Sequence, residues 1–79
     1  MKTEQPPTTT PWGEVQTSEE VADGIFLMST AGHGGYYLAP RRNSELSDTM
    51  KSATFNQQGF QGFYEEDEDA QIIKGWFNL

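Results

Sequence analysis

Two short apolar runs separated by glycines constrain the fold of this chain more than any other feature. Residues 25–28 read Ile-Phe-Leu-Met, and they predict a buried strand over residues 24–29. Residues 36–38 read Tyr-Tyr-Leu and predict a second strand. Three of the four residues at 32–35 are glycines, which allow positive φ and therefore a tight reversal with little strain. The pattern predicts a β-hairpin.

The segments beside this hairpin carry weaker patterns. Residues 14–22 suit either a strand or a short helical turn. Pro40 can occupy the first position of a helix, since its missing N–H is not needed there. Residues 41–53 predict that helix, because Leu46 and Met50 lie four positions apart and share one face.

The C-terminal part predicts a second helix over about residues 64–75, after a loop over residues 56–62. Apolar residues recur there at spacings of three and four. Acidic residues lead the segment and Lys74 lies near its end, as the helix dipole favours. A competing interpretation makes residues 71–77 a strand, because isoleucine and aromatic residues also favour sheets.

These elements predict one small α+β domain, in which a β-hairpin or small antiparallel sheet packs on one or two helices. Residues 1–11 are rich in threonine and proline without periodicity, and we expect a flexible N-terminal arm. Residues 12–79 then form the domain. The 79-residue chain contains no cysteine, so aliphatic and aromatic burial must hold it together without disulfides.

The charge is strongly acidic. Twelve acidic residues face five basic ones, for a formal net charge of -7. Such a surface repels nucleic acids and anionic membranes and attracts basic protein surfaces. The densest acidic run is either a solvated helix N-terminus or a docking patch. The expected partner-binding residues are Glu65, Glu66, Asp67, Glu68 and Asp69, with Glu19, Glu20 and Asp23, and the expected secondary aromatic surface is Tyr36, Tyr37 and Trp76.

The glycine-rich segment around His33 is the most obvious candidate for chemistry. It lacks the Lys-Ser/Thr pair and the GxGxxG spacing of phosphate-binding loops, which favours a simple turn. A thiolate zinc site is excluded, because the chain has no cysteine and His33 is its only histidine. The acidic run also lacks the order of an EF-hand loop. We therefore expect no catalysis, no metal and no cofactor. A small metal-dependent or histidine-based enzyme is one alternative, and a structural or oligomerisation module that forms a homodimer is another.

Three segments together resemble a small uncharacterised domain of proteins from phages and plasmids. They are residues 10–13 (TPWG), residues 29–35 (STAGHGG) with residues 38–40 (LAP) after them, and residues 62–67 (GFYEED). The tail departs from that pattern, because charged residues and a glycine interrupt the expected aliphatic stretch. The resemblance implies no catalytic residue.

A setting in mobile genetic elements implies a type of partner. Short acidic proteins of such elements are often inhibitors of host defence, and many look like proteins whose surface mimics DNA. The resemblance thus implies an anti-CRISPR or anti-restriction inhibitor that occupies the basic surface of a host nucleic-acid-binding protein. The sequence has no apolar run long enough for a membrane span and no signal-peptide pattern, so we expect it in the cytoplasm of the host cell.

Overall fold

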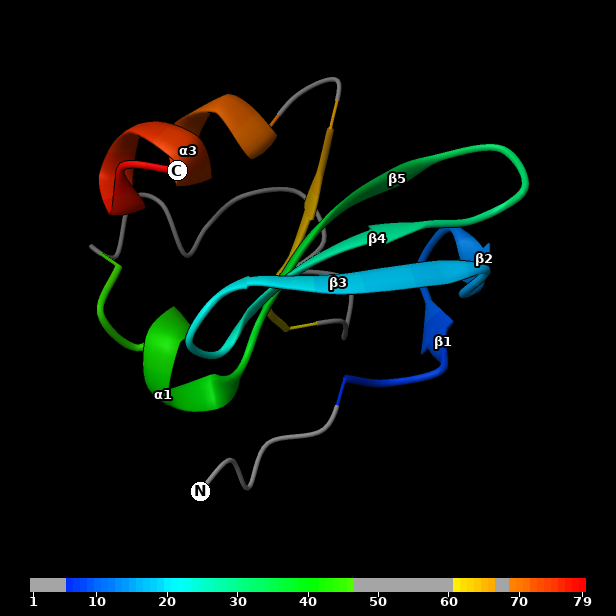
Figure 1. The fold of residues 1–79 in the computed structure, drawn as a ribbon, viewed down its shortest axis with the longest axis horizontal. Coiled ribbons are helices and arrows are strands. Elements are labelled where there is room, and N and C mark those ends of the chain that lie inside the picture. The colour runs from blue at the N-terminus through cyan, green and yellow to red at the C-terminus, as the bar shows by residue number, and fades with distance from the viewer. Residues whose placement is uncertain (1–5, 47–60, 67–68) are drawn as a thin grey trace.

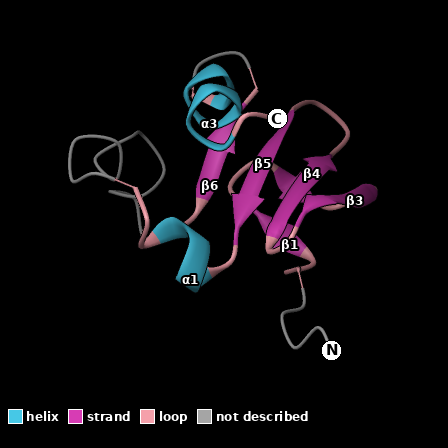
Figure 2. Ribbon diagram, turned by 60° about the vertical axis from the view of Figure 1, so that its left-hand side comes forward, coloured by secondary structure: helices cyan, strands magenta, loops and turns pink. Residues whose placement is uncertain are grey.

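A four-stranded antiparallel sheet is the centre of the molecule in the computed structural model, which describes residues 6–46, 61–66 and 69–79 (Figure 1). The strands lie side by side in the order β3-β4-β5-β6 (Figure 2). They are β3 (Thr17–Ala22), β4 (Ile25–Ser29), β5 (Gly34–Leu38) and β6 (Phe63–Glu65). The described elements therefore belong broadly to the α+β class, and more of the described residues lie in strands than in helices.

The predicted hairpin is confirmed as β4 and β5. Leu27 pairs with Tyr36, and the turn closes with the Thr30 N–H donating to the His33 carbonyl oxygen at 2.7 Å. β5 begins two residues before the predicted strand, because Gly34 and Gly35 also pair with β4. The role predicted for the hairpin glycines is wrong. Positive φ occurs instead at the glycines 13, 24 and 62.

The ambiguous segment 14–22 resolves largely as strand. β3 pairs antiparallel with β4 along its whole length, with an irregular register between Glu20 and Ala22. The alternative of a helical turn is wrong. The β-branched residues of this segment favour an extended strand, and its hydroxyl side chains suit the solvent-exposed edge of a sheet. Among the strands of the described residues, β3 is the outermost on its side of the sheet.

The first helix, α1 (Pro40–Asn43), begins at the predicted proline. The predicted helix over residues 41–53 is wrong at residues 44–46, because α1 ends at Asn43 and turns follow it, with the Leu46 N–H donating to the Asn43 carbonyl oxygen. Leu46 is nevertheless buried, at 3% exposure. The rest of that prediction, from residue 47 to residue 53, lies outside the described residues, as does most of the predicted loop over 56–62.

The second predicted helix is partly right. α3 (Ala70–Phe77) is helical, so the competing strand over residues 71–77 is wrong. The predicted start at residue 64 is also wrong, because Tyr64 lies in β6 and pairs with Tyr36 of β5. Burial of Phe63 and Tyr64 against the two sides of the sheet accounts for this extended conformation.

The sheet is covered on both faces. On the face that we call the helical face, α3 packs over a core of Ile25, Tyr36, Leu38, Leu46, Tyr64, Ala70 and Ile73. On the other, which we call the N-terminal face, the core is Phe26, Met28 and Phe63, with Trp12, Val15 and Tyr37 against it. Trp12 lies between β1 (Thr9–Thr10) and β2 (Gly13–Glu14), which pair with each other. Thr10, in the segment assigned to the N-terminal arm, is buried.

Candidate functional site

Glu65 and Glu66, the first two residues of the acidic run, do not share one patch. Neighbouring residues of a strand point to opposite faces of a sheet. Glu65 pairs in register with Gly35 and contacts the N-terminal face. Glu66 is held by its backbone N–H, which donates to the Gly34 carbonyl oxygen at 2.9 Å. The expectation of a helix N-terminus at these two residues is therefore wrong. Asp69 directly precedes α3, and residues 67 and 68 lie outside the described residues.

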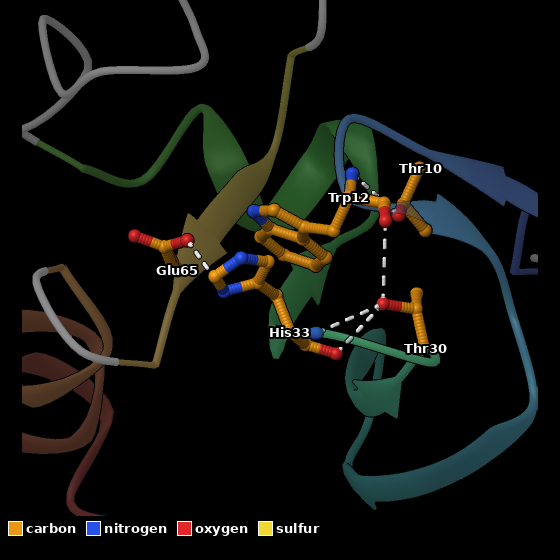
Figure 3. Close-up of polar contacts among 5 residues, drawn as sticks. All are labelled: Thr10, Trp12, Thr30, His33 and Glu65. Atoms are coloured by element: carbon orange, nitrogen blue, oxygen red, sulfur yellow. Dashed lines mark hydrogen bonds and ion pairs between the residues drawn. The ribbon is translucent and has the colours of Figure 1, made fainter.

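On the N-terminal face, Glu65 faces His33. A carboxylate oxygen of Glu65 lies 3.5 Å from His33 Nδ1, and the side chains are 17% and 56% exposed. Figure 3 shows this pair together with Thr10, Trp12 and Thr30. Thr30 Oγ1 accepts from the His33 N–H at 3.2 Å and lies 3.3 Å from the Trp12 carbonyl oxygen. The three segments that carry the family resemblance thus meet at this point.

Gly35 makes this packing feasible. A Cβ atom at Gly35 would lie 2.8 Å from Trp12 Cη2 and 2.2 Å from the Tyr64 carbonyl oxygen. The bare backbone therefore lets the indole lie against the sheet, where it meets Phe63 edge-on at 5.8 Å between ring centroids. The hydroxyl of Thr30 is already engaged with backbone groups, so this arrangement supplies a structural contact between the loop and Trp12.

Within residues 6–46, 61–66 and 69–79, no three histidine or acidic side chains are grouped closely enough to bind a metal ion. In the same ranges, no helix has the length and apolar character needed to cross a membrane.

Two of the acidic residues expected to bind a partner, Glu20 and Asp23, have contacts within their own domain. A carboxylate oxygen of Glu20 accepts the Gly24 N–H at 2.9 Å and so stabilises the turn between β3 and β4. Asp23 forms an ion pair with Arg41 at 2.7 Å. Two of the carboxylates near β3 thus already have hydrogen-bond or ion-pair partners within the domain.

Glu19 and Glu66 remain, and they border a common hollow of about 330 Å³. Its lining residues are Thr17, Ser18, Glu19, Leu27, Met28, Ser29 and Glu66. The register places Glu19 opposite Leu27, and Leu27 opposite Tyr36 of the helical core. The hollow therefore lies on the helical face.

Gly34 lies next to two of the residues that line this hollow, Ser29 and Glu66. It pairs with Ser29, and a Cβ atom on it would lie 3.5 Å from a carboxylate oxygen of Glu66. Because Gly34 carries no side chain, Glu66 can reach across β5 toward β4. The sequence pattern indicates the two glutamates but not Leu27, Ser29 or the role of Gly34, since only strand pairing brings these residues together.

The expected aromatic surface is not continuous. Tyr36 is 8% exposed within the helical core, so its assignment to a surface is wrong. Tyr37 packs against Phe26 and Phe63 on the N-terminal face. Trp76 is 45% exposed, in agreement with its predicted surface position.

The fold and these two sites define a small acidic α+β domain whose sheet carries an open hollow bordered by carboxylates. The chain belongs to the DUF7007 family, described as a domain of unknown function, which matches residues 5–78. No curated protein and no solved structure gives a significant match to it.

Proposed function

We propose that this protein is a small acidic binding protein that occupies a basic surface of a nucleic-acid-handling protein. One observation carries the proposal: Glu19 and Glu66 border one open hollow, and neither forms an ion pair with another described residue. The formal net charge of -7 adds long-range attraction to a basic partner.

The chemistry of the hollow fits a lysine or arginine side chain. The carboxylates of Glu19 and Glu66 can accept hydrogen bonds from an ammonium or guanidinium group, and such charged bonds are stronger than neutral ones. Leu27, 38% exposed, offers apolar surface to the aliphatic part of the same side chain. The hydroxyls of Thr17 and Ser29 hydrogen-bond to each other at the rim.

The finer part of the proposal concerns the partner. The resemblance to domains of phage and plasmid proteins supports an inhibitor of a CRISPR effector or a restriction enzyme, in the cytoplasm of a host cell. Both kinds of enzyme hold DNA in channels lined by basic residues. Occupation of such a channel requires neither catalysis nor a cofactor from the inhibitor.

Competition with DNA tests this proposal. A purified CRISPR effector and a purified restriction enzyme are each incubated with excess protein, and binding of a labelled DNA duplex is measured. The expected result is salt-sensitive loss of DNA binding by at least one of them. The double variant Glu19→Gln/Glu66→Gln should lose this effect, whereas Glu14→Gln/Glu45→Gln removes the same charge elsewhere and should retain it. Equal inhibition by both double variants would contradict the proposed site.

A second candidate function is oligomerisation through α3. Ile72 and Trp76 lie four residues apart on α3, where they are 41% and 45% exposed, and Leu79, beyond the end of the helix, is 37% exposed. An apolar stripe of this kind can pair with a second copy of the chain. A concentration-dependent mass in solution that Trp76→Gln abolishes would support this candidate, and a monomer at all concentrations would exclude it.

A further inference from the structure

The outer edge of β3 lies next to the hollow. β3 is the terminal strand of the sheet formed by the described residues, and its first three residues are exposed. An edge strand directs alternate backbone N–H and C=O groups outward, where another strand can pair with them. The irregular register after Glu20 limits regular pairing to Thr17–Glu20.

Edge and hollow are continuous through β3. Thr17, Ser18 and Glu19 belong to the edge strand and also line the hollow. In a strand added beside β3, every second side chain would point to the helical face, toward Glu19. A lysine or arginine at that position can extend past Glu19 and place its charged group in the hollow that Glu66 borders.

The charge of an added strand determines how favourably it can pair with this edge. A second copy paired through β3 would bring Glu19 and Glu20 of both copies into one short ladder, where like charges oppose pairing. A segment rich in lysine or arginine would instead face these carboxylates with opposite charge. The edge therefore favours a basic partner over self-association.

We propose that β3 accepts an extended basic segment of the partner as a fifth strand, and that one of its lysine or arginine side chains occupies the hollow between Glu19 and Glu66. This inference rests on the proposed function and adds to it the conformation of the bound segment. The backbone of the added strand contributes affinity, and the hollow selects its cationic side chain.

The test uses a ten-residue peptide of alternating lysine and threonine, labelled for fluorescence anisotropy. Two further peptides carry N-methyl groups on the amides of one edge or of the other edge. A strand can pair through the unmethylated edge of each, and when both peptides run antiparallel to β3 their lysines then point to opposite faces. One methylated peptide should therefore bind at least tenfold more weakly than the other, and Glu19→Gln or Glu66→Gln should weaken the better one about threefold to tenfold. Glu14→Gln is the control and should have little effect.

Hydrogen exchange of the protein supplies the second measurement. The unmethylated peptide should slow exchange of amides within Thr17–Glu20. Binding that ignores methylation and leaves these amides unprotected, yet still depends on Glu19 and Glu66, would overturn the strand addition and leave the basic-surface function standing. Absence of binding to the peptide and to every basic protein tested would overturn both.

Discussion

Replacement of Gly35 by alanine tests the packing of both faces of the sheet. The added Cβ would lie 2.2 Å from the Tyr64 carbonyl oxygen and 2.9 Å from the Glu65 Cα, both backbone atoms of the neighbouring strand. Because backbone cannot rotate away as a side chain can, β5 and β6 must separate, and Trp12 must also move. Overpacking of this kind costs about 1–3 kcal/mol, and contact with backbone places Gly35→Ala near the upper end.

That loss is large for a domain of this size. At about 0.05–0.15 kcal/mol per residue, the 79-residue chain has about 4–12 kcal/mol of stability. A loss of about 3 kcal/mol should lower the Tm by about 12–24 °C, measured by circular dichroism.

Gly32→Ala is the matched control for this substitution. Gly32 has nothing within 4 Å of the added atom and no positive φ. Its stability should stay the same or rise by less than about 1 kcal/mol, through reduced entropy of the unfolded chain. Equal melting temperatures for the two variants would refute the pairing of β5 with β6 across Gly35.

Two further substitutions extend the test to other parts of the fold. Trp12→Ala should lower the free energy of unfolding by about 3 kcal/mol in urea, because it removes a large side chain that packs on Phe63; an unchanged midpoint would show that the N-terminal residues do not cover the sheet. Gly75→Ala should raise the free energy of unfolding by about 0.5–1 kcal/mol, because Gly75 lies within α3 with open space around it; a decrease would show that this position is not helical.

The hairpin was predictable because its signal is local. The residues from 24 to 38 contain two dense apolar runs and the turn between them, so neighbouring residues decide the structure. The strand β6 was not predictable in the same way. Only three residues long, it is followed by acidic residues typical of a helix start, and the pairing of Tyr64 with Tyr36 is non-local.

Only the acidic character of the candidate site was predictable from the sequence. Sequence analysis named Glu19 and Glu66, but it grouped Glu66 with Glu65 as one helical patch. Strand alternation instead directs Glu65 toward His33 on one face and leaves Glu66 at the hollow on the other. The two adjacent glycines of β5 likewise serve different faces, since Gly35 accommodates Trp12 and Gly34 underlies Glu66. Such assignments require the register of three strands.

The most direct test of the docking surface is an NMR titration of the ¹⁵N-labelled protein with decalysine. We expect the largest shift changes to cluster at Glu19, Leu27, Ser29 and Glu66, and to weaken with added salt because exposed charges are screened. Glu14 and Glu45, acidic residues away from the hollow, should change little. Changes spread evenly over all acidic residues, or centred on α3, would contradict the assignment of partner binding to the hollow beside β3.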